Sequence, residues 1–219
     1  MKLEKLYNSP LFHFFEILYK LIIFNLLFIL TLVLGLGIFG YMISLIILVL
    51  AIKSLDNEIE YSIVKTWIMN IKKHFKSSLK LSIFYTVSSS FFVFDTIYFY
   101  LSMEQAPTVF NTIFFYVFLV VDMFVGFAVI NSAFVYVYFP NLNIRKNLKY
   151  SFKLIQLIPM QALLLIFGFG ITVVLFYVFP IALAFIWFSL VIFVYHLSIK
   201  KTYKRLVADD VKSLNMFEY

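Results

Sequence analysis

Apolar residues follow one another in this chain in long runs that no charged residue interrupts. Residues 21–52 contain no aspartate, glutamate, lysine or arginine, and neither do residues 154–199. A helix rises about 1.5 Å per residue and crosses a hydrocarbon core of about 30 Å in roughly 20 residues, so each run is too long for one crossing. Each run is therefore predicted to form a helical hairpin. Residues 21–34 are apolar at odd and even positions alike. This excludes a membrane β-barrel, whose strands alternate apolar and polar residues.

Turn residues and charged residues divide the whole chain into six predicted spans of one membrane domain. Gly35, Gly37 and Gly40 mark the turn of the first hairpin, and a polar loop with Glu104 and Pro107 separates the middle pair. The spans cover about 17–34, 41–52, 81–101, 108–139, 154–175 and 179–199. The predicted fold is thus all-α, a polytopic membrane helix bundle. An alternative with the same orientation has four spans and one re-entrant hairpin.

Between the second and third predicted spans, apolar residues recur every four positions. They are Ile59, Ile63, Trp67, Ile71, Phe75 and Leu79. Five lysines lie off this line, so residues 57–80 are predicted to form an amphipathic cytoplasmic helix. Its apolar stripe is expected in the headgroup region of the bilayer or under the bundle, with the lysines reaching anionic lipid phosphates. The simpler interpretation is that the helix only rigidifies a loop.

The charges predict the orientation of the chain. All 18 lysines and arginines fall into four groups, at the two ends and after the second and fourth spans. An even number of spans places these groups on one side, which the positive-inside rule assigns to the cytoplasm. A multi-pass protein of the cell membrane with both termini cytoplasmic is therefore expected. The same rule accounts for the net charge of +7, so no nucleic-acid partner is predicted.

Composition agrees with this assignment. Hydrophobic residues make up 63% of the 219 positions and charged residues 13%, whereas soluble domains have about 45–50% and about 25%. This balance excludes an ordinary water-soluble domain. Glu4 and Glu16 precede the first apolar run, and no alanine occurs before Ala51. The first helix is therefore expected to remain as an anchor rather than to be cleaved as a signal peptide.

Four polar residues inside the predicted spans are the candidates for a substrate-binding site. Asp95 lies toward the outer third of the third span, and Asp122 lies nearer the middle of the fourth. No lysine or arginine occurs at their depth, so each acid must be protonated, hydrogen-bonded by neutral groups or open to water. Asn25 and Asn131 are polar residues that could converge with Asp122 in the core. His196 lies near the inner end of the sixth span.

Two interpretations of these residues remain open. In the first, Asp95 or Asp122 forms a proton or cation site of a small transporter or channel. In the second, the side chains form interhelical hydrogen bonds, worth about 0.6–2 kcal/mol each. Thr96, Tyr98 and Tyr100 are the hydroxyl donors expected near Asp95.

The chain lacks the residue patterns of common enzymes. Its three histidines, His13, His74 and His196, fall on different predicted elements, and it has no cysteine. It contains neither a His-Glu-x-x-His pattern nor a phosphate-binding Gly-x-x-x-x-Gly-Lys loop. A non-enzymatic protein without metal or cofactor is therefore predicted.

Several short features resemble the YesL family of bacterial membrane proteins. They are Asn-Leu-Leu at 25–27, the basic segment after the second span, Asp95 followed by Tyr98, and Phe-Pro at 139–140. The chain differs from the family in having Phe28 where tryptophan is more frequent. The resemblance implies a six-span bacterial inner membrane protein that acts as an accessory to carbohydrate uptake. It also implies a membrane-protein partner such as a sugar importer of the ABC type, besides the lipid bilayer.

Overall fold

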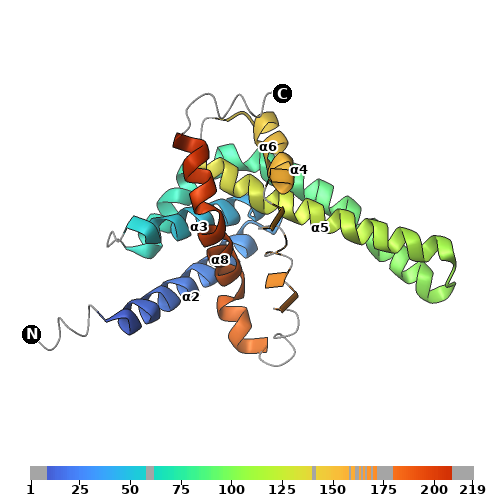
Figure 1. Cartoon of the computed structure of the whole chain (residues 1–219), viewed down its shortest axis with the longest axis horizontal. Coiled ribbons are helices and arrows are strands. Elements are labelled where there is room, and N and C mark those ends of the chain that lie inside the picture. The colour runs from blue at the N-terminus through green and yellow to red at the C-terminus, as the bar shows by residue number, and fades with distance from the viewer. Residues whose placement is uncertain are drawn as a thin grey trace, which may run out of the picture.

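The computed structural model describes residues 9–57, 62–139, 142–157 and 180–208, together with single positions between 159 and 171. The described part is all-helical, as predicted (Figure 1). Its helices are α2 (Pro10–Leu34), α3 (Tyr41–Ser54), α4 (Ile63–Gln105), α5 (Val109–Tyr138), α6 (Ile144–Leu157) and α8 (Pro180–Ala208). A 3₁₀ turn, η1 (Leu55–Asn57), follows α3. Much of the predicted span 154–175, including residues 172–175, lies outside the described residues.

Local sequence sets where two of the long helices begin. The side chain of Ser9 accepts a hydrogen bond from the backbone N–H of Phe12, and Pro10 occupies the first turn of α2, where its missing N–H costs nothing. Thr108 caps α5 in the same way, accepting from the N–H of Asn111 at 3.2 Å. Each cap satisfies a backbone donor that has no partner within its own helix.

Helix α4 joins two segments that the sequence analysis treats as separate. It runs without interruption over 43 residues, so the predicted amphipathic segment 57–80 and the predicted span 81–101 belong largely to one helix. No glycine or proline occurs between Ile63 and Gln105, and Pro107 follows the end of the helix. Trp67, on the predicted apolar stripe, is buried against Phe24 of α2. This part of the stripe therefore faces the bundle.

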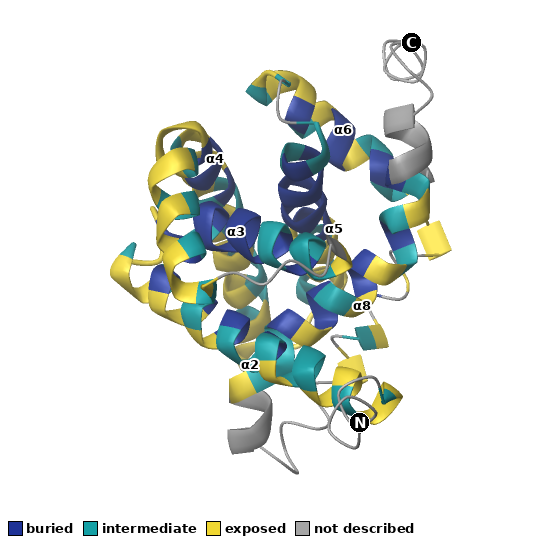
Figure 2. Ribbon diagram, turned by 90° about the vertical axis from the view of Figure 1, so that its left-hand side faces the viewer, coloured by how far each residue is buried: buried dark blue, intermediate teal, exposed yellow. Residues whose placement is uncertain are grey.

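Four helices in the described residues are long and apolar enough to cross a membrane. They are Pro10–Leu34, Ile63–Gln105, Val109–Tyr138 and the Phe185–Tyr203 part of α8. Helix α3 is also apolar, but its 14 residues reach only about 21 Å, less than the hydrocarbon core. Instead it occupies the centre of the bundle, where most of its residues are fully buried (Figure 2).

The turn between α2 and α3 is built on close backbone approach. A Cβ atom added to Gly35 would lie 2.3 Å from the Cα of Gly40, so a larger residue does not fit there. Leu36 and Gly37 both have positive φ. The backbone N–H of Met42, just after this turn, donates to the hydroxyl oxygen of Ser82 in α4 at 2.9 Å. The turn therefore lies beside the middle of α4.

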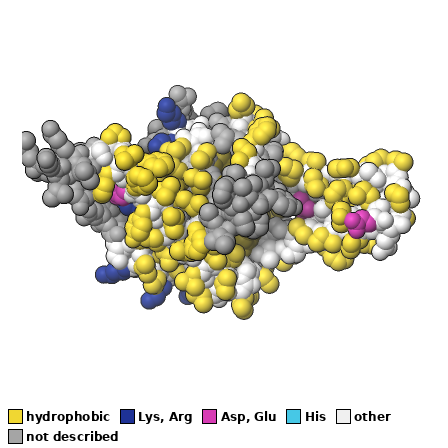
Figure 3. Space-filling view, turned by 90° about the horizontal axis from the view of Figure 1, so that it is seen from below, with side chains coloured by type: hydrophobic (Ala, Val, Ile, Leu, Met, Phe, Trp, Pro, Cys, Tyr) yellow, Lys and Arg dark blue, Asp and Glu magenta, His cyan; other side chains and the backbone are white. Residues whose placement is uncertain are grey.

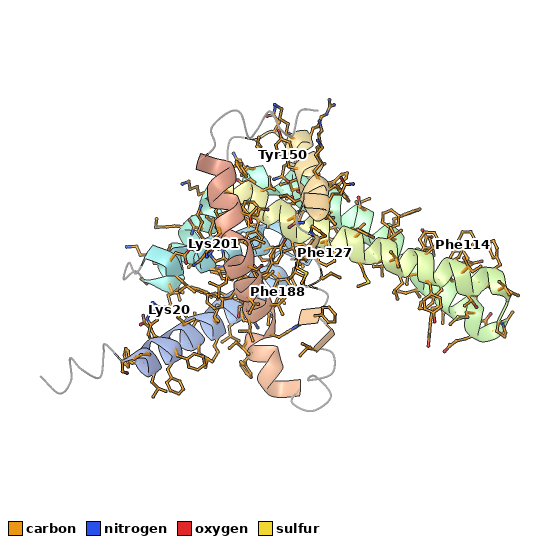
Figure 4. The ribbon with its side chains drawn as sticks, viewed as in Figure 1. Lys20, Phe114, Phe127, Tyr150, Phe188 and Lys201 are labelled. Carbon is orange, nitrogen blue, oxygen red and sulfur yellow. The ribbon has the colours of Figure 1, made fainter. Side chains whose placement is uncertain are left out.

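The outer parts of α4 and α5 form a hairpin that projects from the bundle. We call residues 87–124 of this hairpin the arm (Figure 1). The ring of Phe99 in α4 stacks on Phe114 and Phe118 of α5, with centroids 5.2 and 5.4 Å apart (Figure 4 labels Phe114). The outward faces are apolar, and Phe94 is 69% exposed. Hydrophobic side chains cover most of the arm in Figure 3, with acidic atoms among them.

Candidate functional site

The four residues singled out from the sequence do not form one site. Asn25 is buried between α2 and α8, where its side-chain oxygen accepts from the backbone N–H of Ser189 at 3.1 Å. The hydroxyl of Ser189 donates to the carbonyl of Leu21 at 2.8 Å. Asn25 thus joins α2 to α8. Asn25, Asn131 and Asp122 each form a hydrogen bond to a different described residue, namely Ser189, Tyr195 and Thr96.

Asn131 belongs to a separate polar network between α5, α6 and α8. Its side-chain oxygen accepts from the hydroxyl of Tyr195 at 2.5 Å, and its amide donates to the carbonyl of Ser151 at 3.4 Å. Ser132, the next residue, donates to the side-chain oxygen of Asn147 at 2.5 Å, and Ser151 donates to the carbonyl of Asn147. All five side chains are buried. Because its buried members are mutually hydrogen-bonded, the network has the character of a structural tie.

Of this network only Asn131 was singled out from the sequence, although a signal exists for two of the other four members, Asn147 and Ser151. Asn147, Tyr150, Ser151 and Leu154 are all buried and recur at helical spacing on one face of α6 (Figure 4 labels Tyr150). The basic residues of the same segment indicate its exposed face, and the buried face is less apparent from the sequence. A mixed polar and apolar face with this period indicates a helix packed on hydrogen-bonding neighbours.

The two acids predicted to lie within spans, Asp95 and Asp122, belong to the arm. The carboxylate of Asp122 accepts a hydrogen bond from the hydroxyl of Thr96 across the α4–α5 hairpin, at 2.6 Å. Thr96 had been expected beside Asp95, and Tyr100, another expected donor, bonds Glu104 instead. Asp95 is half-buried and has no hydrogen bond or ion pair within the described part of the chain. Asp95 is thus the less satisfied of the two acids.

A third polar cluster forms at the opposite end of the bundle from the arm. Asp56 of η1 lies 3.3 Å from Nε2 of His196 and accepts from the ammonium of Lys200 at 3.1 Å. Lys53 lies over the ring of Tyr138, 4.2 Å from its centroid. Burial raises the pKa of the Asp56 carboxyl, but the hydrogen bonds from Lys200 and His196 outweigh it and hold that pKa below its ordinary value. The charges thus tie the end of α3 to α8.

His196 was predicted near the inner end of its helix, and its contact with Asp56 was not predicted. Asp56 escaped notice because it precedes the basic segment, where an acid is ordinarily solvated. One sequence feature does indicate a buried role for Asp56: it follows directly on α3, a helix that is apolar on all sides.

An apolar crevice of about 610 Å³ lies between α2, α3, α5 and α8. Phe28, Tyr41, Phe127 and Phe188 are among its lining residues (Figure 4 labels Phe127 and Phe188). Phe28 and Phe188 stack with centroids 4.5 Å apart. Catalysis ordinarily needs polar groups that converge on a reacting atom, and this lining is almost wholly apolar. Among the described residues, no group of three potential metal ligands occurs.

Comparison with known proteins adds no relative to these observations. No family model, no curated protein and no solved structure matches the chain.

Proposed function

We propose that this protein is a non-enzymatic membrane adaptor that binds another membrane protein through its arm. The observation that supports the proposal most directly is Asp95, which has no hydrogen bond or ion pair among the described residues while it lies within an apolar helical hairpin. The outward faces of that hairpin carry large apolar side chains. A protein partner accounts for both features together.

The depth of Asp95 makes lipid alone an unfavourable neighbour. Lys80 and Glu104, the charged residues that flank this part of α4, are separated by about 36 Å along the helix, close to the thickness of the hydrocarbon core. Asp95 lies about 22 Å from Lys80 and about 13 Å from Glu104. A charged side chain at the centre of a membrane helix costs about 2.5–3.5 kcal/mol on the insertion scale. A partner helix with a lysine, arginine or hydroxyl at the same depth removes this cost.

The resemblance to the YesL family supplies the first partner to test. It implies an accessory role in carbohydrate uptake, and we therefore propose the membrane subunits of an ABC-type sugar importer as partner. The chemical requirement on the partner is independent of this choice. It is an apolar helix with a cationic or hydrogen-bonding side chain that reaches Asp95.

For the topology, we propose that both ends are cytoplasmic and that the α2–α3 hairpin is re-entrant. The hydrogen bond between Met42 and Ser82 supports this arrangement, because a turn on the outer surface would lie about 30 Å from residue 82. The cluster of Lys53, Asp56 and Lys200 supports a common inner end for α3 and α8. We thus prefer the four-span alternative named from the sequence over six full spans, with α2 entering and leaving on one side together with α3, although its length alone would allow a crossing.

A small transporter or channel is the second candidate. It needs Asp95 or Asp122 on a polar path, and the hydrogen bond between Asp122 and Thr96 is the observation in its favour. Flux in proteoliposomes that is unchanged by Asp95→Ala and Asp122→Ala would remove this candidate.

The test of the adaptor is co-purification of the tagged full-length chain from native membranes in mild detergent. We expect a membrane protein to co-purify with the wild type, and Asp95→Ala to lower its recovery by roughly tenfold, because each 1.4 kcal/mol lost is a factor of ten. Glu104→Ala is the matched control, since Glu104 is an exposed carboxylate of the same helix. Purification without any other membrane protein, or equal recovery with both variants, would contradict the proposal. Recovery of further copies of this chain alone would count against it too.

A further inference from the structure

A basic pocket of about 590 Å³ lies where α4, the end of α5 and the start of α6 meet. Six of its lining residues are Lys76, Ser77, Lys80, Tyr136, Asn143 and Arg145. Its lining comes from α4, from the end of α5 and from the start of α6, so segments far apart in sequence build this pocket.

The pocket carries three positive charges that no acid of the described residues neutralises. Within the described part of the chain, neither Lys76, Lys80 nor Arg145 forms an ion pair, and no aspartate or glutamate lines the pocket. The same three residues come from two helices, so their convergence is a property of the fold and not of a local run of lysines. A concave site with one sign of charge concentrates counter-ions of the opposite sign.

Neutral hydrogen-bonding groups complete the lining. The hydroxyl of Tyr136 is held by Nδ1 of His74 at 3.1 Å and by the hydroxyl of Ser77. The carbonyl of Asn143 accepts from the N–H of Asn147 at 2.9 Å, which makes Asn143 the residue that opens α6. The first-turn N–H groups of α6 add donors and the positive end of a helix dipole at the pocket. Donors from three helices thus surround one cavity.

We propose that this pocket binds a phosphate group, and that its source is the headgroup of an anionic phospholipid. Lys80 directly precedes the apolar part of α4, which puts the pocket at the level where lipid headgroups lie. Basic pockets between membrane helices on the cytoplasmic side accept such headgroups. The arm plays no part in this inference, so it stands independently of the adaptor.

Native mass spectrometry of the detergent-purified full-length chain tests the pocket. The probes are dioctanoyl phosphatidylglycerol, dioctanoyl phosphatidylcholine and inorganic phosphate. We expect phosphatidylglycerol to bind more tightly than phosphatidylcholine, and the triple variant Lys76→Gln, Lys80→Gln, Arg145→Gln to weaken its binding roughly tenfold or more. The single variant Arg145→Gln changes one exposed residue, and we expect it to lose part of the phosphatidylglycerol binding. It tests the pocket even where the triple variant does not fold.

The matched control is Lys65→Gln, Lys72→Gln, Lys73→Gln, which removes the same charge from exposed positions of the same helix outside the pocket. We expect less than about a twofold effect from it, because its lysines do not line the cavity. Pocket-dependent binding of inorganic phosphate without phosphatidylglycerol would support the phosphate site and assign it a soluble source. An equal loss in both triple variants, or no binding of either probe, would overturn the proposal.

Discussion

The backbone N–H of Met42 donates a hydrogen bond to the hydroxyl oxygen of Ser82, 40 residues away along the chain. Helix α3 begins after Gly40, which has no side chain to cap the first turn. The N–H of Met42 would therefore be unsatisfied in a buried position, and Ser82 supplies the cap from another helix. One hydroxyl thus fixes the start of the central helix against α4.

Ser82→Ala is expected to lower the free energy of unfolding by about 1 kcal/mol, because replacing a capping side chain by alanine costs about 0.5–2 kcal/mol. The measurement is thermal unfolding of the purified protein in detergent. Ser90→Ala is the control, since Ser90 is an exposed serine of the same helix. Equal unfolding temperatures for the two variants would show that the bond does not contribute.

Trp67 has two separable contacts with α2. Its Nε1 donates to the hydroxyl of Thr31 at 2.9 Å, and its ring stacks on Phe24. We expect Trp67→Phe, which removes the hydrogen bond and part of the ring but keeps an aromatic side chain, to cost clearly less than Trp67→Ala, for which we expect about 3–5 kcal/mol. Phe75→Ala, on the same predicted stripe but exposed, is expected to stay within about 0.5 kcal/mol of the wild type. Chemical or thermal unfolding in detergent measures all three, and a cost for Phe75→Ala as large as that for Trp67→Ala would contradict the assignment.

Asp56 predicts a loss of stability in acid. Its pKa in the folded protein is lowered, so its contribution is complete above the unfolded-state pKa of about 3.9 and is lost as pH falls through the folded-state pKa. Lys200→Gln removes one hydrogen bond and should shrink this pH dependence, and Asp56→Asn should abolish it. Lys201→Gln is the control, because Lys201 is exposed. The unfolding temperature measured between about pH 3 and 6 decides, and identical pH profiles for the wild type and Asp56→Asn would exclude the pairing.

The absence of cysteine makes the proposed topology easy to test with single-cysteine variants. We expect Ala106→Cys to react with a membrane-impermeant maleimide in intact cells, and Ile38→Cys not to react, because a re-entrant turn stays within the membrane. Lys201→Cys should react only after permeabilisation. Outside labelling of Ile38→Cys as complete as that of Ala106→Cys would favour six full spans instead.

Period and charge were sufficient to predict helices in this chain, because a long uncharged apolar run has no other way to satisfy its backbone in lipid. Local turn residues also predict two helix ends: α3 begins directly after Gly40, and α5 ends shortly before Pro140. The continuity of α4 did not follow, because the change from lysine-rich to apolar composition near Lys80 suggests an interface. A helix crosses such a boundary without a break when no glycine or proline stops it.

Partners of the polar residues were harder to predict than the helices. Asn131 meets Tyr195, 64 residues later, and Asp56 meets Lys200, 144 residues later. Such pairings depend on how the helices cross one another. The sequence indicates only on which face of its helix a residue lies and how far along the predicted span. Depth placed Asp95 and Asp122 in the membrane, but only packing distinguishes Asp122, which bonds Thr96, from Asp95, which bonds no described residue.

Site-specific photocrosslinking in native membranes tests the adaptor most directly. A photoreactive phenylalanine analogue replaces Phe94, an exposed arm residue next to Asp95, or Phe15, an exposed residue of α2. We predict a protein adduct with another membrane protein at position 94, loss of most of that adduct when Asp95→Ala is added, and a much weaker one at position 15. Lipid adducts alone at position 94, or the same protein adduct at both positions, would contradict the arm as the docking element.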